Sequence, residues 1–351
     1  MVKTREKIIV GISVGDMNGI GPEIILKTFE DMRMLELCTP VLFANSRVFT
    51  FIKKYLRSKT NFVYTDQLDR IQHGKFNIFN TWNEPVDINF GKRDTIVGGY
   101  AIESFTSATQ ALKDEKIDVL VTAPIDKHNV QSDKFHFPGH TDYLNQELDG
   151  EALMLMVNGG LRVGLLTEHL PLSEVTAHIT PQKITEKVKI IHHSLIQDFN
   201  ILKPRIAILG LNPHNGDHGV IGDQDDTIIK PTVEKLFEDG YLVSGPFPAD
   251  GFFGSALHEK FDGVLACYHD QGLVPFKTLS FGKGVNFTAG LDKIRTSPDH
   301  GTAFDIAGKG IADFSSFREA VYAAIDIYNN RVAYEESKKN PLKINNNSRK
   351  E

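Results

Sequence analysis

The stretch Phe261–Gly310, FDGVLACYHDQGLVPFKTLSFGKGVNFTAGLDKIRTSPDHGTAFDIAGKG, joins a predicted buried strand to a dense set of chemically active side chains. Its first residues, FDGVLACYH, form a short apolar run that ends in polar residues, which is typical of a strand inside a parallel sheet. His269 and Asp270 then offer nitrogen and oxygen ligands. The final segment, HGTAFDIAGKG (300–310), is rich in glycine, which lets backbone approach a flat polar ligand, so we expect a nucleotide there.

Similar apolar runs recur along the whole chain and alternate with helical patterns. They are KIIVGISVG (7–15), TPVLFAN (39–45), IDVLVTAP (117–124), LRVGLLT (161–167) and PRIAILGLN (204–212). Apolar spacing predicts helices in 98–115 and 179–199, the second capped by Thr180 with Pro181 in its first turn. The sequence therefore predicts an α/β protein with mostly parallel sheet covered by helices, which binds its ligands at the carboxyl ends of strands.

Composition limits the class of protein. The 351 residues, 41% hydrophobic and 24% charged, suit one large domain or two lobes around a cleft, and we favour two lobes. A formal net charge of −6 argues against nucleic-acid binding. Cys38 and Cys267 are the two cysteines, which fits a reducing compartment without a disulfide framework. The apolar run near the N-terminus is too short for a membrane span and has no cleavage site, so we expect a cytoplasmic protein.

Two segments lack the features of a core. Residues 66–93 have few long apolar runs and predict a surface excursion between core strands. The polar tail 336–351, ESKKNPLKINNNSRKE, is too poor in apolar residues to pack and is expected to be mobile.

Three histidines follow predicted strands: His169, His214 and His269. Three imidazoles with an open coordination position can hold a catalytic divalent metal. Most of the 13 histidines in the chain must instead be surface or hydrogen-bonded core residues. His218 is a competing ligand in the same loop as His214, and its alternative role is that of a solvated loop residue.

Four basic side chains, Lys277, Lys283, Lys293 and Arg295, follow His269. They could neutralise a phosphorylated substrate, or they could form a solvated charged face. Because glycines and turns interrupt the run, we select Lys277 and Arg295, together with Asn286, as substrate ligands, and leave Lys283 and Lys293 as surface residues.

Two further segments precede predicted helices. In PGHTDYL (138–144), His140 and Thr141 could present a donor and a hydroxyl to phosphate, or Thr141 could simply cap the helix. GDMNGIGPEI (15–24) lacks the GxGxxG spacing of a Rossmann phosphate loop. Pro22 is expected to open a helix there, with Asp16 or Asn18 facing a ligand.

Taken together, these motifs resemble the 4-hydroxythreonine-4-phosphate dehydrogenase family of pyridoxal phosphate biosynthesis. The motifs that carry the resemblance occur in order from about residue 10 to residue 328: GDMNGIGPEI, TAPIDK, PGHTDYL, LRVGLLTEHLPL, GLNPHNGDHG, GPFPADGFF, YHDQGLVPFK and NFTAGLDKIRTSPDHGTAFDIAGKG. The last motif is also similar to the adenosine-contacting loop of isocitrate and isopropylmalate dehydrogenases. The chain departs from the family pattern at Met17 and Asn18, and in a shortened loop that carries the extra His218.

The resemblance implies a two-lobed fold related to those dehydrogenases, with the active site in the interdomain cleft at the subunit interface of a homodimer. The lobes would comprise residues 1–137 with 284–335, and residues 138–283. A divalent metal (zinc, magnesium or cobalt) would be held by His169, His214 and His269. The phosphorylated substrate would meet His140, Thr141, Lys277, Asn286 and Arg295, while NAD or NADP would meet His300, Gly301, Thr302, Ala303 and Asp305.

The activity implied is oxidation of 4-phosphohydroxy-L-threonine to 2-amino-3-oxo-4-phosphooxybutanoate, which decarboxylates to 3-amino-2-oxopropyl phosphate. Lys277, Asp250 and Asp270 are the expected catalytic groups, although hydrogen bonding within the fold would equally explain the two carboxylates. A related dehydrogenase acting on threonate or erythronate 4-phosphate is the nearest alternative. A metal-dependent hydrolase is disfavoured by the predicted nucleotide loop, and a non-catalytic binding protein by the set of metal ligands beside it.

Overall fold

A computed structural model describes residues 7–132 and 135–339 of the chain. Twelve strands in this part of the chain form one sheet in the order β3-β4-β2-β1-β5-β12-β11-β6-β7-β10-β8-β9. The strands are β1 (Ile8–Ser13), β2 (Cys38–Ala44), β3 (Phe62–Thr65), β4 (Phe76–Asn80), β5 (Val119–Thr122), β6 (Gly150–Asn158), β7 (Leu161–Leu165), β8 (Ile206–Leu209), β9 (Val243–Phe247), β10 (Gly263–Ala266), β11 (Val285–Leu291) and β12 (Arg295–Pro298).

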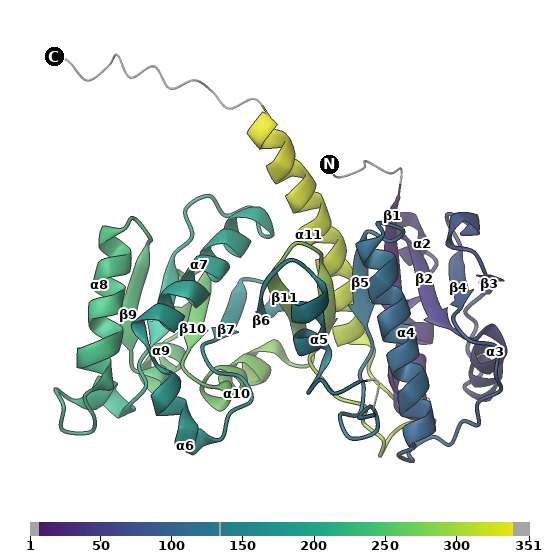
Figure 1. The fold of residues 1–351 in the computed structure, drawn as a ribbon, viewed down its shortest axis with the longest axis horizontal. Helices are drawn as coiled ribbons and strands as arrows, with labels where there is room; N and C mark the ends of the chain where they lie inside the picture. The colour runs from purple at the N-terminus through teal and green to yellow at the C-terminus, as the bar shows by residue number, and fades with distance from the viewer. Residues whose placement is uncertain (1–6, 133–134, 340–351) are drawn as a thin grey trace.

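Helices cover both faces of the sheet, as the α/β pattern predicted (Figure 1). The α-helices are α1 (Gly21–Thr28), α2 (Met34–Leu37), α3 (Ser46–Tyr55), α4 (Thr95–Lys113), α5 (His140–Glu147), α6 (Leu172–Val175), α7 (Pro181–Gln197), α8 (Lys230–Glu238), α9 (Ala249–Gly254), α10 (His269–Ser280) and α11 (Ser315–Lys339). Short helical turns are η1 (Leu68–Arg70), η2 (Thr176–His178), η3 (Pro213–Gly216), η4 (Asp225–Ile229) and η5 (Leu257–Lys260).

Local sequence explains the predicted helices. The side chain of Thr180 accepts a hydrogen bond from the Lys183 amide and caps α7, whose first residue is Pro181. Pro22 likewise lies in the first turn of α1. Proline suits this position because its fixed φ is helical and the amide hydrogen that it lacks would have no partner within the helix. Both predicted helix starts are confirmed.

The two halves of the sheet run in opposite directions. Pairing is parallel from β3 to β12 and again from β7 to β9, whereas β12–β11, β11–β6 and β6–β7 are antiparallel. Three antiparallel steps in succession reverse the strand direction between β12 and β7. In Figure 1 the N-terminal elements occupy the right side and residues from about 160 to 280 the left side, with α11 between them.

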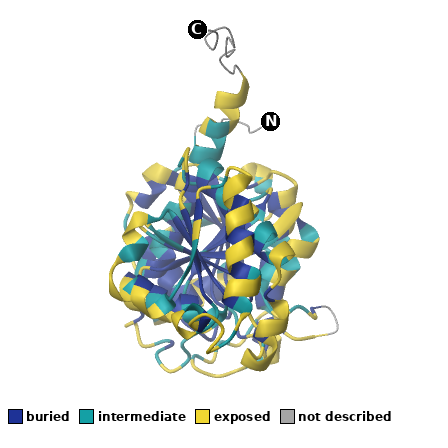
Figure 2. Cartoon of the chain, turned by 90° about the vertical axis from the view of Figure 1, so that its left-hand side faces the viewer, coloured by how far each residue is buried: buried dark blue, intermediate teal, exposed yellow. Residues whose placement is uncertain are grey.

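Alternating side chains give the sheet two different faces. On one face, a single apolar cluster continues across the molecule from Val10 through Phe287 to Leu236 and includes residues of α11. On the other face there are two separate clusters, one around Phe105 of α4 and one around Phe276 of α10. Figure 2 shows the buried strands enclosed by helices whose outward faces are exposed. The gap between the two clusters lies over β12, β11 and β6.

The structure corrects two segment predictions. Residues 66–93 are not wholly a surface excursion, since they include β4, which pairs with β2 and β3 and buries Phe76 and Ile78. The helix α11 continues through residues 336–339, which we had placed in the tail. The remaining tail, 340–351, lies outside the described residues. Of the helices in the described part of the chain, none is long and apolar enough to cross a membrane.

Candidate active site

A cleft with a cavity volume of about 270 Å³ lies between the two apolar clusters. The floor of the cleft is formed by alternate side chains of four strands, which point to the same face of the sheet. They are Thr122 of β5, Arg295 and Ser297 of β12, Asn286 of β11, and Met154 and Met156 of β6. Their strand neighbours, such as Val121, Phe287 and Leu155, point into the continuous core on the opposite face. One sheet face therefore supplies packing while the other supplies polar groups to a ligand.

Arg295 lies at the bottom of the cleft and is only 3% exposed. Its Nε and Nη2 donate to Thr122 Oγ1 at 3.0 and 2.6 Å, and its Nη1 donates to Thr288 Oγ1 at 3.2 Å. Burial lowers the pKa of this guanidinium to about 9. Within the described chain no carboxylate comes within ion-pair distance of it. A buried cation whose hydrogen-bond partners in the described chain are all uncharged is poorly compensated, so the site favours an anionic ligand.

His140, at the start of α5, lies directly against Arg295. The Arg295 Nη2 donates to His140 Nδ1 at 3.1 Å, which places the imidazole proton on Nε2 in the neutral ring. Burial, reinforced by Arg295 and Lys127, holds the pKa of His140 well below its ordinary value. The buried Nε2 has no hydrogen-bond partner within the described chain. His140 is therefore a neutral donor beside the buried guanidinium.

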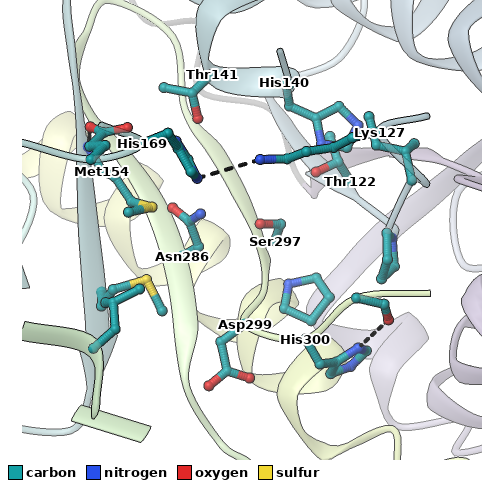
Figure 3. Close-up of a pocket in the computed structure, with 18 of the residues that line it drawn as sticks. Thr122, Lys127, His140, Thr141, Met154, His169, Asn286, Ser297, Asp299 and His300 are labelled. Atoms are coloured by element: carbon teal, nitrogen blue, oxygen red, sulfur yellow. Dashed lines mark hydrogen bonds between the residues drawn. The ribbon is translucent and has the colours of Figure 1, made fainter. Parts of the chain in front are cut away.

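Lys127 and His169 approach each other across the upper part of the cleft, with Thr141 and Asn286 nearby (Figure 3). The Lys127 Nζ lies 3.4 Å from His169 Nε2. Burial, Lys127 and His269 lower the pKa of His169, which favours the neutral imidazole that a metal requires. Lys127 lies just past β5, in the motif TAPIDK.

His269 is the second predicted metal ligand in the cleft, and its ring centroid lies 5.8 Å from that of His169. Its Nδ1 lies 2.7 Å from Asp270 Oδ1. A carboxylate on one ring nitrogen orients an imidazole and leaves the other nitrogen for a ligand. These two rings fit part of the predicted divalent-metal site.

His214 does not join them in the cleft. It lines a neighbouring cavity of about 600 Å³ together with Asp250, Asp270 and Gln271. Within residues 7–132 and 135–339, no group of three or more His, Cys, Asp or Glu side chains is placed to hold a metal. The described chain by itself therefore supplies two of the three predicted ligands, His169 and His269, in one place.

The loop that carries His214 has an unusual backbone. His214, Asn215, Asp217 and His218 have φ values of 51°, 55°, 43° and 55°, in the left-handed region that non-glycine residues rarely adopt. Asp225 holds this loop by accepting the amides of Leu211 at 2.7 Å and Asn212 at 3.0 Å. Backbone held in such a conformation by its surroundings is typical of functional loops. We had assigned no role to Asp225.

The predicted nucleotide loop, 300–310, packs closely against the N-terminal part of the chain. Ile20 N donates to Thr302 O at 2.9 Å, and a Cβ at Gly308 would lie 2.7 Å from the Phe90 ring. A Cβ at Gly301 would meet no atom of the described chain within 4 Å. Gly308 is thus needed for packing, whereas the backbone at Gly301 is open to a ligand.

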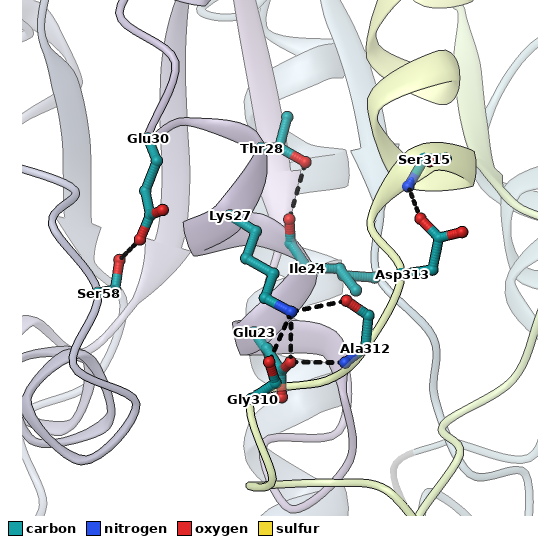
Figure 4. Close-up of polar contacts among 10 residues, drawn as sticks. All are labelled: Glu23, Ile24, Lys27, Thr28, Glu30, Ser58, Gly310, Ala312, Asp313 and Ser315. Atoms are coloured by element: carbon teal, nitrogen blue, oxygen red, sulfur yellow. Dashed lines mark hydrogen bonds and ion pairs between the residues drawn. The ribbon is translucent and has the colours of Figure 1, made fainter.

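The end of this loop is held by α1, as Figure 4 shows. Lys27 Nζ donates to the carbonyls of Gly310 at 3.0 Å and Ala312 at 2.8 Å, and forms an ion pair with Glu23 at 2.9 Å. The buried Glu23 in turn accepts the Ala312 amide at 2.7 Å. These contacts fix the point at which the loop enters α11.

The structure brings most of the predicted site residues together. The cleft is lined by His140, Thr141, His169, His269, Lys277, Asn286, Arg295, His300 and Gly301. Thr302, Ala303 and Asp305 continue along the loop outside that lining, while Asp250 and Asp270 line the neighbouring cavity. Lys283 is exposed, as expected of a surface residue, and Lys293 lies 3.7 Å from Glu115.

Two local interpretations are wrong. Asp16 and Asn18 do not face the cleft, because both are fully buried and Asp16 accepts hydrogen bonds from the Asn18 amide and the Asn129 side chain. Thr141 does not cap α5, since the N-cap is Gly139. Glu168, to which no sequence motif assigned a role, lines the cleft just before His169, and burial raises its pKa.

Comparison with known proteins agrees with this arrangement. The family model described as "Pyridoxal phosphate biosynthetic protein PdxA" matches residues 36–324. The chain belongs to the PdxA family. Among curated PdxA relatives, the 4-hydroxythreonine-4-phosphate dehydrogenase of Bacteroides thetaiotaomicron is 45% identical over 97% of this chain and 94% of its own length.

A D-threonate 4-phosphate dehydrogenase of Cupriavidus necator is 38% identical over 92% of this chain and 98% of its own length. The crystal structure of 4-hydroxythreonine-4-phosphate dehydrogenase from Klebsiella pneumoniae superposes with a TM-score of 0.80 at 29% identity, covering 93% of this chain and 99% of that one. The PdxA family thus includes relatives whose names give different phosphorylated substrates.

Proposed function

We propose that this protein is an NAD- or NADP-dependent dehydrogenase that oxidises 4-phosphohydroxy-L-threonine in the synthesis of pyridoxal 5'-phosphate. The observation that carries the proposal is the buried Arg295, which has no carboxylate partner in the described chain and lies in a cleft adjoining the loop 300–310. The 45% identical Bacteroides relative bears the name of that activity.

The substrate's anionic groups would be bound by Arg295 and the Nε2–H of neutral His140, with Lys277 adding a mobile positive charge. Asn286, whose buried Oδ1 has no partner in the described chain, would accept a hydrogen bond from a substrate hydroxyl or amine. The dinucleotide would be held by His300, Gly301, Thr302, Ala303 and Asp305, of which His300 and Gly301 also line the cleft.

Oxidation of the substrate's C3 hydroxyl sends a hydride to the nicotinamide and a proton to a base. Asp250 or Asp270 from the neighbouring cavity, or Lys277 when it is in its neutral amine form, would take the proton. The resulting β-keto acid loses carbon dioxide and takes up a proton, giving 3-amino-2-oxopropyl phosphate. A divalent cation bound by the histidines would polarise the hydroxyl and stabilise negative charge on its oxygen.

His169, His269 and His214 would hold that cation. Because His214 lines the neighbouring cavity, we propose that the site is completed between two copies of the chain in a homodimer. Exposed apolar residues on and just after α10 support this: Val274 is 60% and Phe281 is 85% exposed, on the element that carries His269 and Lys277. Size-exclusion chromatography with light scattering would test the homodimer.

A second candidate is oxidation of D-threonate 4-phosphate, favoured by the 38% identical Cupriavidus relative. The deciding experiment follows absorbance of reduced nicotinamide with 4-phosphohydroxythreonine, D-threonate 4-phosphate or erythronate 4-phosphate, each with added divalent metal and with a chelator. Metal-dependent reduction that strongly favours 4-phosphohydroxythreonine supports a role in vitamin B6 synthesis. Preference for a sugar-acid phosphate supports the same oxidation in a different pathway. If the cofactor is not reduced with any of the three substrates, the dehydrogenase proposal is contradicted.

A further inference from the structure

The cleft contains the carboxylate of Glu168 as well as the cation of Arg295, and each lacks an ion-pair partner in the described chain. Glu168 lines the cleft, and its Oε1 accepts a 3.3 Å hydrogen bond from the Met154 amide. Within the described chain, no lysine, arginine or histidine nitrogen lies within 4.0 Å of its carboxylate. The neighbouring Lys187 pairs instead with Glu151 at 3.0 Å. The same cleft thus presents a cation and an anion that both lack a close partner of opposite charge.

The sheet register brings these two charges near each other. Arg295 Nη1 bonds Thr288 Oγ1, and Glu168 Oε1 bonds Met154 N. Thr288 of β11 lies directly opposite Met154 of β6. Since residues opposite each other in an antiparallel pair have Cα atoms about 5 Å apart, the two charged ends lie on the order of 10 Å apart. A small phosphorylated molecule with an opposite charge near its other end fits between them.

The other carboxylates of the cleft are less suited to bind a cation. Asp142 lines the cleft on α5 but is exposed, so water screens its charge. Asp299 lies beside the nucleotide loop, and its Oδ1 is 3.1 Å from Ser316 Oγ. Glu168 is half-buried, and a charge there acts through a lower dielectric than a charge on the exposed Asp142.

We propose that Glu168 binds the ammonium group of a zwitterionic phosphorylated substrate and so selects 4-phosphohydroxythreonine over D-threonate 4-phosphate. This inference rests on the proposed dehydrogenase function for its substrates, which differ in an ammonium and a hydroxyl at C2. A carboxylate gains both an ion pair and hydrogen bonds from the ammonium, while from the hydroxyl it gains a hydrogen bond without the ion pair. A buried polar contact of this type is able to decide between similar substrates.

The test compares the wild type with Glu168→Gln, which keeps the shape and the Met154 hydrogen bond but removes the charge. Asp142→Asn is the matched control, since it neutralises the exposed carboxylate of the same cleft. The ratio of kcat/KM for 4-phosphohydroxythreonine to that for D-threonate 4-phosphate is measured with saturating metal and cofactor. Binding of both compounds without cofactor is measured in parallel by calorimetry.

We expect Glu168→Gln to lower the kcat/KM ratio and the ratio of binding constants at least tenfold, with D-threonate 4-phosphate little affected, and Asp142→Asn to leave both ratios unchanged. Equal losses for both compounds, or no change for either, would overturn the role of Glu168. If the wild type reduces no cofactor, the dehydrogenase proposal fails, and the calorimetric ratio still decides whether Glu168 recognises the ammonium group.

Discussion

Nη2 of Arg295 lies 3.1 Å from Nδ1 of His140, which joins the start of β12 to the start of α5 across 155 positions of sequence. Since arginine only donates, the imidazole must accept and therefore stays neutral. The pKa of each group is lowered by burial, and that of His140 also by the charge of Arg295. The pair therefore carries a buried positive charge that has no carboxylate partner in the described chain.

Replacing Arg295 should weaken recognition of the substrate without lowering the stability of the unliganded protein. In Arg295→Met, we expect kcat/KM for the phosphorylated substrate to fall about 100-fold or more, because charge-assisted hydrogen bonds to an anion are worth about 1.5–3 kcal/mol each. The melting temperature of the unliganded variant should be unchanged or higher, since an uncompensated buried charge costs stability. Thermal melts with and without 10 mM phosphate check this, and a large drop in the melting temperature without ligand would contradict it.

Stability should fall in mild acid because of His140. Its pKa is below the ordinary 6.5 in the folded protein, so below about pH 6.5 the unfolded chain takes up a proton that the folded chain does not. The stability present above pH 6.5 is therefore lost as pH falls. In His140→Asn, whose amide oxygen still accepts from Arg295, this loss should be smaller, the remainder coming from groups such as His169 and His192. Urea denaturation at pH 7.5 and 5.5 provides the comparison, and an equal pH dependence in both proteins would refute the prediction.

Turnover and metal binding should require His214 but not its neighbour His218. His214→Ala should abolish turnover and lower bound metal while leaving circular dichroism unchanged, and addition of a chelator to the wild type should have the same effect on turnover. His218→Ala, in the same loop and with a similar positive φ, is the control and should retain activity. Full activity and metal content in His214→Ala would exclude it as a ligand.

The contacts that hold the nucleotide loop against α1 should affect the KM for the dinucleotide more than the KM for the phosphorylated substrate. Lys27→Met removes the bonds to Gly310 and Ala312 and leaves the buried Glu23 without its cation. We expect KM for the dinucleotide to rise severalfold with little change in KM for the phosphorylated substrate, and stability to fall by about 2 kcal/mol. Lys235→Met, which breaks an exposed pair with Asp239, should leave stability nearly unchanged. Parallel increases in both KM values would argue against a role in the loop alone.

Short-range patterns explain why the elements were predictable. The six apolar runs expected as strands are β1, β2, β5, β7, β8 and β10, since each is buried on both faces and therefore almost continuously apolar. Six strands were missed: β3, β4 and β9, and three that line the cleft, β6, β11 and β12. The cleft-facing positions of the last three include Met156, Asn286 and Arg295, so the polar alternation that makes the site also weakens the strand signal.

The sequence by itself determined the α/β class, the helix starts at Pro22 and Pro181, and nine of the residues that line the cleft, because these depend on local spacing and on ordered motifs. Only the tertiary structure decided the reversal of strand direction across β11 and β6, the separation of His214 from His169, the burial of Asp16 and Asn18, and the placement of Glu168 in the same cleft as Arg295. Those features depend on which distant strands pair and in what register. Pairing and register follow from packing the whole sheet, and no local pattern encodes them.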